Sequence, residues 1–362
     1  MTQKVVEVLL SKIGGEFSVG LQEKCLSVIA SIAGASHACR DQLLELGTHE
    51  RIFLASNKDQ LLVLQSGLAR TTAKLFQGIP TPSFGFTLPA LPLLVHFLRT
   101  VEELVVLEDV CKAIDDVTRE YDQEQIQRVI LDTGICASLL RLIRNGTFPL
   151  KSLCLSILGT FSTGTEAHTE MFVASGCLPI LKELLDNYDT DKKLTKVACW
   201  IVSNIASQFS MVQALLDTGV IDSLFLQMHF ADEGIRKEVI WALTNALSNC
   251  NPKQTAELVK KDCIKYLSEF VCNLDERIVS ISLEGFGNIL SHGELLKPEN
   301  NQINPYAEIV EREGGLDRIE SLQAHVNELI FKKSSELIER FFWSEEDALE
   351  DINQDPGNGF VF

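Results

Sequence analysis

The most informative side chains of this sequence are two Trp–Asn pairs, which could bind a ligand. Trp200 is followed by Asn204, and Trp241 is followed by Asn245. Residues four apart lie one above the other on one face of a helix. The spacing from Trp200 to Trp241 is 41 residues, and so is the spacing from Asn204 to Asn245. If the chain repeats with that period, both pairs fall on the same surface.

A ladder of indoles and carboxamides suits an extended cationic peptide. Packed helices lie about 8–10 Å apart, and an extended peptide advances about 3.3 Å per residue, so successive Trp rings frame slots for alternate side chains. A Lys or Arg stem between indoles gains apolar and cation–π contact worth ~0.5–2 kcal/mol. The Asn amide could bind main-chain N–H and C=O groups. Glu238, three residues before Trp241, would select for positive charge.

The alternative interpretation makes Trp200 and Trp241 core residues. For one isolated Trp that would be the better interpretation. Here an Asn four residues along the same stripe would then be buried too, and an unpaired buried amide is costly. The repeated pairing therefore favours a binding role.

Both pairs fall in helical segments that recur with a regular period. Apolar residues recur at helical spacing along nearly the whole chain. Gly134, Gly176 and Gly219 lie 42 and 43 residues apart, each just before an apolar helical segment. Glycine there supplies the positive φ that lets one helix end and the next turn away. A period of about 40–47 residues with two or three helices is typical of HEAT and armadillo repeats.

We therefore predict an all-α, armadillo-repeat, right-handed superhelical solenoid with about eight repeats and a concave groove. The alternative is a helical bundle with accidental spacing. The stretch 79–92, rich in proline, is predicted to be an extended connection. The second helix of each unit should begin near Gln22, Leu64, Leu107, Leu150, Lys193, Lys237, Val279 and Glu328.

The composition limits the classes of partner that the chain is expected to bind. The chain has 362 residues, which is long for one compact core, and a formal net charge of −18. A phosphate backbone needs a basic surface, so nucleic acid is a poor partner. Acidity favours a basic partner, or alternatively only keeps the protein soluble. The most apolar stretch, 79–98, is interrupted by four prolines, so we expect no membrane span, and no signal peptide is recognisable.

The sequence offers little for catalysis or metal binding. Its ten cysteines form no C-x-x-C pair, and no His cluster has zinc-ligand spacing, which indicates a reducing compartment, no metal and no cofactor. No phosphate-binding loop, nucleophile elbow or H-E-x-x-H motif is present. His168 is expected to be solvated or at the rim of a site. We expect that the chain is not an enzyme.

From Leu88 to Phe342 the sequence resembles importin-α, the armadillo receptor for basic nuclear localisation signals. The resemblance rests on SLEGFGNIL at 282–290, Asn304-Pro305-Tyr306, the segment 314–320 and LIERFF at 337–342. The family has ten repeats, so the resemblance implies that this chain corresponds to the third onward. We accordingly divide it into divergent N-terminal repeats (1–87), importin-α-like repeats (88–344) and an acidic disordered tail (345–362).

The resemblance implies two peptide sites in the groove, of which the minor one matches here. It assigns Glu238 to an arginine of the ligand and the loop after position 162 to the preceding lysine. One repeat after Trp241, Asn288 keeps the ladder while Glu284 replaces the aromatic residue. The implied peptide-binding residues are Thr163, Gly164, Glu166, Thr169, Trp200, Ser203, Asn204, Glu238, Trp241, Asn245, Glu284 and Asn288.

The second, major site departs from the family pattern. Its Trp and Asn positions correspond here to Ser27/Ser31, Arg70/Lys74 and Lys112/Asp116, whereas Asp109 is kept. Arg70, Lys74 and Lys112 would put positive charge where a basic peptide must lie, and like charges at contact distance are unfavourable. Alternatively, these side chains turn outward to solvent.

The function implied is binding of basic nuclear localisation signals, with localisation in cytoplasm and nucleus. Only Lys4 and Lys12 are basic among the first twenty residues, so recruitment of importin-β and self-inhibition through a basic arm are doubtful. An interaction of the C-terminal repeats with the nuclear export receptor is a further prediction from the resemblance. The alternative is a non-transport armadillo scaffold or a competitor of intact receptors.

Overall fold

The computed structural model describes residues 3–14, 16–56, 63–120, 122, 133–187, 191–297 and 303–342. These residues form helices and connections and contain no strand. The chain divides into two compact units, Met1–Ile201 and Val202–Phe362. The predicted acidic tail lies outside the described residues, and the proposed divergence before residue 88 stays a prediction. Each unit is described by itself below.

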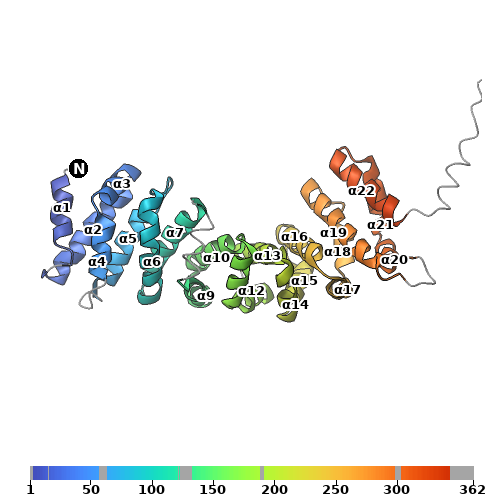
Figure 1. The fold of residues 1–362 in the computed structure, drawn as a ribbon, viewed down its shortest axis with the longest axis horizontal. Helices are drawn as coiled ribbons and strands as arrows, with labels where there is room; N and C mark the ends of the chain where they lie inside the picture. The colour runs from blue at the N-terminus through green and yellow to red at the C-terminus, as the bar shows by residue number, and fades with distance from the viewer. Residues whose placement is uncertain are drawn as a thin grey trace, which may run out of the picture. The chain divides into compact units, whose positions relative to one another are not determined.

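The first unit is a stack of helices that ends within α13 (Figure 1). Its helices are α1 (Gln3–Ser11), α2 (Val19–Ala35), α3 (His37–Glu45), α4 (Thr48–Ser56), α5 (Gln65–Phe76), α6 (Phe84–Thr100), α7 (Leu104–Glu120), α9 (Ile135–Asn145), α10 (Phe148–Ser162), α11 (Glu166–Ala174), α12 (Cys177–Asp186) and α13 (Lys192–Ala206).

The second unit continues the pattern from the end of α13. Its helices are η2 (Phe209–Met211), α14 (Val212–Asp217), α15 (Val220–Phe230), α16 (Glu233–Asn249), α17 (Pro252–Lys260), α18 (Cys263–Phe270), α19 (Glu276–Glu294), α20 (Pro305–Arg312), α21 (Gly315–Ser321), η3 (Leu322–Ala324) and α22 (Glu328–Phe341).

The longest helix of each repeat packs on its counterpart in the next repeat. In the first unit α2 lies against α5, α5 against α7 and α7 against α10; in the second, α16 lies against α19 and α19 against α22. The stripe on α7 that drives this packing is Val106, Val110, Ile114 and Val117, all completely buried. Burying each such side chain stabilises the stack by roughly 1.5–3 kcal/mol.

The repeat predicted from the sequence is confirmed. The eight helices predicted near Gln22 through Glu328 begin at residues 19, 65, 104, 148, 192, 233, 276 and 328. Gly134, Gly176 and Gly219 have φ of 67°, 87° and 74° and precede α9, α12 and α15. Asp262, with φ of 65°, makes the same left-handed turn before α18, where the glycine pattern gave no signal.

The prediction of an extended connection over 79–92 is wrong in its second half. Helix α6 begins at Phe84 and includes both Pro89 and Pro92. A proline inside a helix costs about 3 kcal/mol because it removes a hydrogen bond and crowds the preceding turn. Burial of one face of α6 against α5 and α7 offsets that cost. The buried side chains include Leu91, Leu94, Phe97 and Leu98.

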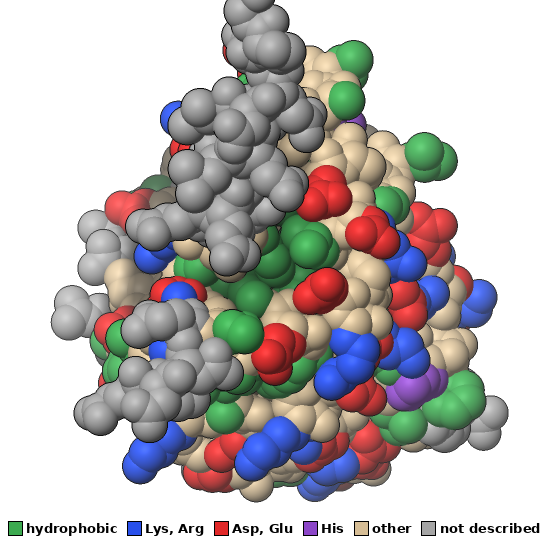
Figure 2. Space-filling view, turned by 90° about the vertical axis from the view of Figure 1, so that its right-hand side faces the viewer, with side chains coloured by type: hydrophobic (Ala, Val, Ile, Leu, Met, Phe, Trp, Pro, Cys, Tyr) green, Lys and Arg blue, Asp and Glu red, His purple; other side chains and the backbone are tan. Residues whose placement is uncertain are grey.

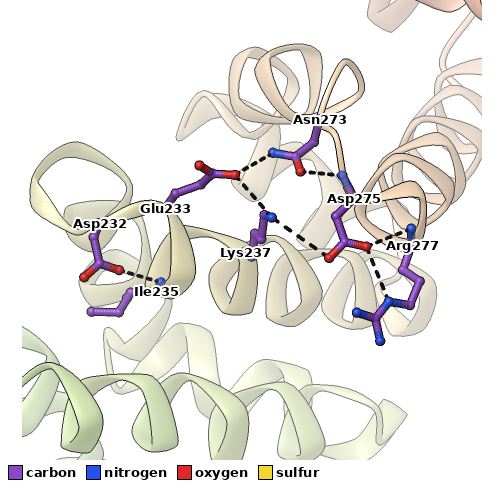
Figure 3. A network of polar contacts seen from close by, with 7 residues as sticks. All are labelled: Asp232, Glu233, Ile235, Lys237, Asn273, Asp275 and Arg277. Carbon is purple, nitrogen blue, oxygen red and sulfur yellow. Dashed lines mark hydrogen bonds and ion pairs between the residues drawn. The ribbon is translucent and has the colours of Figure 1, made fainter.

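A polar network joins consecutive repeats of the second unit (Figure 3). Lys237 of α16 reaches Glu233 at 3.2 Å and Asp275 at 3.9 Å. Asn273 donates to Glu233 Oε1 at 3.1 Å and accepts from the Asp275 backbone N–H at 2.9 Å. The hydrogen bond from Asn273, followed by the one from Lys237, lowers the pKa of Glu233. The network therefore ties the start of α16 to the loop before α19.

The surface carries charge of both signs. Figure 2 looks at the side of the molecule where α20 to α22 lie in Figure 1. Acidic and basic side chains are interspersed there, and hydrophobic side chains gather in a hollow between them.

Within the described residues, no single helix is both long and apolar enough to cross a membrane. Helix α13 and the bent segment after it together reach the length and composition of a membrane span.

Candidate peptide-binding site

Trp200 is exposed on α13 and rests on α10 of the first unit. Its side chain keeps 37% of its surface exposed. A Cβ built on Gly159 would lie 2.1 Å from Cζ3 of the indole, so the ring covers this glycine. Gly159 lies 41 residues before Trp200, at the equivalent place one repeat earlier. Sequence reasoning missed Gly159, although the repeat spacing contained the signal.

The loop between α10 and α11 presents three of the four residues assigned to it. Thr163 and Glu166 are exposed and Gly164 is half-buried. The Thr163 hydroxyl donates to the Thr160 carbonyl at 2.8 Å, which orients the end of α10. Thr169 is completely buried and its hydroxyl donates to the Thr165 carbonyl at 3.3 Å. The Thr169 side chain therefore stabilises the loop and offers no surface to a ligand.

His168 corrects another expectation. It was expected to be solvated or at the rim, but only 7% of its surface is exposed. Its Nδ1 lies 3.1 Å from the Thr165 hydroxyl. The imidazole thus helps to hold the first turn of α11, because Thr165 precedes that helix.

Asn245 of the second unit has a fixed orientation. Its Nδ2 donates to the Ser203 carbonyl oxygen at 3.1 Å and lies 3.0 Å from the Ser203 hydroxyl. A carbonyl oxygen only accepts, so the amide nitrogen must face α13. The amide oxygen of Asn245 remains as the polar atom that these bonds leave unused. Ser203 is 5% exposed, so it positions Asn245 instead of contacting a ligand directly.

The same arrangement recurs in the next repeat. Asn288 of α19 donates from Nδ2 to the Ser248 hydroxyl at 2.9 Å. Asn204, Asn245 and Asn288 are all half-buried, and each lies on the long helix of its repeat. In Asn245 both amide N–H groups are directed at Ser203 of the preceding helix, so this carboxamide presents its oxygen as an acceptor. In Asn288 one N–H is bound to Ser248, so the predicted pairing of a donor with an acceptor remains possible there.

Trp241 lies one turn before Asn245 on α16. Its side chain is 36% exposed, which excludes a place inside the core of the second unit. Glu238 is half-buried one turn earlier on the same helix. An exposed indole, a carboxylate and an oriented carboxamide oxygen thus follow one another along one helix face. This set can bind an apolar stem with a cationic end beside a main-chain N–H.

Glu284 differs from its predicted role as a free contact. Lys333 of α22 forms an ion pair with Glu284 and donates to the Ser280 hydroxyl at 2.7 Å. A cavity of about 460 Å³ adjoins this pair and is lined by both of these side chains, Asn288 and Arg340. The lysine neutralises the carboxylate, so Asn288 is the polar ligand that this repeat still offers. Lys333 was not identified from the sequence.

Comparison with known proteins identifies the repeat and its relatives. Residues 165–207 match the armadillo/beta-catenin-like repeat, and residues 304–357 match the atypical Arm repeat. Importin subunit alpha-8 of Arabidopsis thaliana is 29% identical over 88% of this chain, and importin subunit alpha-1a of Oryza sativa subsp. japonica is 32% identical over 93%. The chain is an armadillo-repeat homologue of importin-α subunits. It spans 71% of the Arabidopsis protein but only 64% of the rice protein.

Solved structures support the solenoid fold. An engineered protein matches 92% of this importin-α homologue with a TM-score of 0.73 at 19% identity and is itself covered over 77%. A designed armadillo repeat protein in complex with a (KR)4 peptide matches 69% of the chain with a TM-score of 0.60 at 21% identity and is covered over 99%. At this identity the likeness shows the fold, and the predicted armadillo solenoid is confirmed.

The N-terminal positions of the importin-α homologue carry paired charges. Lys74 of α5 lies 2.8 Å from Asp109 of α7, and Arg70 lies 3.9 Å from Glu103. Asp116 accepts from the Gly78 backbone N–H at 2.8 Å. Lys112 is exposed. Arg70 and Lys74 line a groove instead of turning outward.

Most of the cysteines are buried and unreactive. All ten are free thiols, and eight of them are buried. Burial raises the pKa of Cys136 to about 11 and that of Cys250 to about 12, so the nucleophilic thiolate is scarce at neutral pH.

No group of metal-ligating side chains is found in the described part of the chain. The homologues are importin-α subunits and armadillo-repeat proteins, not enzymes.

Proposed function

We propose that this protein binds extended Lys/Arg-rich peptides of cargo proteins for import into the nucleus. The observation that carries the proposal is the orientation of the Asn245 carboxamide. Asn245 lies one turn after the exposed Trp241, and its side chain is held by hydrogen bonds to Ser203. Asn288 repeats the orientation one helix later. The first unit offers a candidate binding surface of its own, made of Trp200 and the loop residues Thr163, Gly164 and Glu166.

The amide oxygens suggest how the peptide backbone is bound. Asn245 presents an acceptor, which suits a main-chain N–H group of a ligand, and Asn288 also has an amide oxygen to offer. In an extended chain, side chains alternate between two faces. Every second ligand side chain would then point toward the indoles while backbone N–H groups bind the carboxamides. This mode requires an extended backbone and does not read the ligand sequence.

The negative charge of the protein favours Lys and Arg side chains in the ligand. A Lys or Arg beside Trp241 places its methylenes on the indole, and its charged end is attracted by the ring and by Glu238. The net charge of −18 raises the local concentration of cationic ligands before contact. Glu284 contributes little to this selection because Lys333 neutralises it. In the second unit we place the charge selection at Glu238, one turn before Trp241.

The proposal is tested by peptide binding to the purified chain. A labelled Lys/Arg-rich peptide is titrated in fluorescence polarisation against the parent, Trp200→Ala, Trp241→Ala and the double variant. Each indole should contribute roughly 2- to 30-fold in affinity, the equivalent of ~0.5–2 kcal/mol. Phe230→Ala is the matched control, because Phe230 is a 68% exposed aromatic of the second unit outside the candidate site. Equal affinities of parent and double variant would refute the proposal.

The transport role has its own test. A tagged basic cargo is followed in permeabilised cells supplied with the parent or the double variant, with and without importin-β. Nuclear accumulation that depends on Trp200 and Trp241 would support a receptor acting between cytoplasm and nucleus. Peptide binding without accumulation would favour the scaffold or competitor instead. Two expectations stay predictions in both cases: that importin-β is not recruited through a basic arm, and that the C-terminal repeats bind the export receptor.

A further inference from the structure

We infer that Lys74 and Arg70 close the groove of the first unit to Lys/Arg-rich peptides, because they pair with Asp109 and Glu103 and put positive charge in its lining. The N-terminal groove is a cleft of about 600 Å³ beside α2 and α5. Its lining is Glu23, Ser27, Ala30, Ser31, Gly34, Val63, Ser66, Gly67, Arg70, Thr71, Lys74 and Glu103. The inference concerns a different surface from the peptide site proposed above and does not depend on it.

Lys74 is the internal partner of the Asp109 carboxylate. Its Nζ lies 2.8 Å from Asp109 Oδ1 and donates to Gln77 Oε1 at 2.9 Å. Gln77 in turn donates to the Asp109 carbonyl at 2.7 Å. The side chains of Lys74 and Asp109 are 33% and 22% exposed. A peptide ammonium would have to displace an internal one that is tethered and already hydrogen-bonded.

Arg70 adds a second positive charge one turn earlier on α5. Its side chain is 48% exposed, and its guanidinium is 3.9 Å from Glu103. Both cations line the groove. A cationic side chain entering there meets like charges at close range, which is unfavourable by several kcal/mol when contact is direct.

The groove also lacks the aromatic and carboxamide side chains that could offset this repulsion. Its described lining contains no aromatic side chain. Ser27 and Ser31 stand on α2, and the Ser31 hydroxyl donates to the Ser27 carbonyl at 2.8 Å. Neither a stacking surface for an apolar stem nor a carboxamide for the peptide backbone is therefore presented there. The groove differs from the Trp241 region in charge, in aromatic content and in hydrogen bonding.

The decisive experiment removes the internal cations. In a Trp241→Ala background, Arg70→Met with Lys74→Met keeps the hydrocarbon stems and exposes Asp109, to which Gln77 still donates. Isothermal titration with a Lys/Arg-rich peptide should show affinity at least roughly tenfold higher than Trp241→Ala alone, because the like charges are gone. Adding Asp109→Asn should abolish the gain. Lys182→Met is the matched control, since Lys182 pairs with Asp186 elsewhere in the first unit.

A second measurement keeps the inference falsifiable if the double variant unfolds. Asp109→Asn in the otherwise unchanged protein should leave peptide affinity and stoichiometry the same, because the parent does not use this carboxylate for ligands. A loss of affinity there, or no gain in the folded Arg70→Met/Lys74→Met variant, overturns the inference. If the parent binds no peptide, the proposed function fails, whereas a gain in the variant still supports the closed groove.

Discussion

The indole of Trp200 covers Gly159 so closely that a Cβ at position 159 would lie 2.1 Å from ring atom Cζ3. The two residues are on neighbouring long helices, α13 and α10. The absence of a side chain at 159 therefore sets where the exposed edge of Trp200 lies. Gly159 is therefore a positioning residue for Trp200.

Gly159→Ala should displace the indole and lower both stability and peptide affinity. Overpacking of this kind costs about 1–3 kcal/mol, and a misplaced indole loses a contact worth ~0.5–2 kcal/mol in binding. Thermal unfolding and fluorescence polarisation measure the two effects. Gly34→Ala is the control, because a Cβ there meets nothing within 4 Å. Unchanged affinity for Gly159→Ala would show that Trp200 does not contact the peptide.

Ser203→Ala should weaken peptide binding less than Asn245→Ala. The serine variant removes one hydrogen bond, worth about 0.5–1.5 kcal/mol, but Asn245 keeps its bond to the Ser203 carbonyl. Asn245→Ala removes the acceptor itself. Ser321→Ala, whose hydroxyl donates to the Arg318 carbonyl on the second unit, should leave affinity unchanged. The reverse order, with Ser203→Ala more harmful, would mean that Ser203 contacts the ligand directly.

Lys333→Met should strengthen the binding of cationic peptides. The substitution leaves the Glu284 carboxylate without its internal partner, and an exposed ion pair with a ligand contributes roughly two- to fivefold in affinity. Adding Glu284→Gln should return the affinity to that of the parent, which a double-mutant cycle detects. Weaker binding by Lys333→Met would contradict the assignment of Lys333 as an internal competitor.

Substitutions in the left-handed turns before α12 and α18 should shift the unfolding temperature in opposite directions. Asp262→Gly should raise the unfolding temperature, because a non-glycine residue at φ of 65° is unfavourable by about 1–2 kcal/mol. Gly176→Ala should lower it by a similar free energy, although a Cβ at 176 has space. Thermal denaturation by circular dichroism measures both. Shifts of the same sign would exclude backbone strain as the cause.

Asn273→Ala should raise the pKa of Glu233, because the hydrogen bond from Asn273 is the main cause of its lowered value. A lowered pKa in the folded state stabilises the protein above the unfolded pKa of Glu, and this contribution disappears as the pH falls through the folded pKa. The variant should therefore lose part of its stability difference between neutral and acidic pH. NMR titration of the Glu233 carboxyl measures the shift, with Asn327→Ala as the control that leaves it unchanged.

Much of the fold could be predicted because it depends on local spacing. Helical periodicity and the glycines at 134, 176 and 219 located the repeat, since a positive φ and a buried stripe are properties of short segments. Helix α6 escaped this reasoning. Its prolines favour an extended chain locally, but burial between neighbouring helices outweighs that preference.

The candidate site was predicted in its residue types and only partly in its geometry. Equivalent positions 41 residues apart placed Trp and Asn on corresponding helix faces. The burial of Thr169 and the turn of the Asn245 amide toward Ser203 depend on neighbouring helices. These contacts decide which atoms remain for a ligand, and they have no local signature.

Local sequence patterns specified most of the helices, the period of the repeat and the stripe that carries the indoles and carboxamides. Which charges are paired depends on the packed fold, because Lys74 meets Asp109 from 35 residues away and Lys333 meets Glu284 from 49. Periodicity encodes which face a side chain occupies. Pairing between charges depends on the spacing and rotation of packed helices, which no single segment specifies.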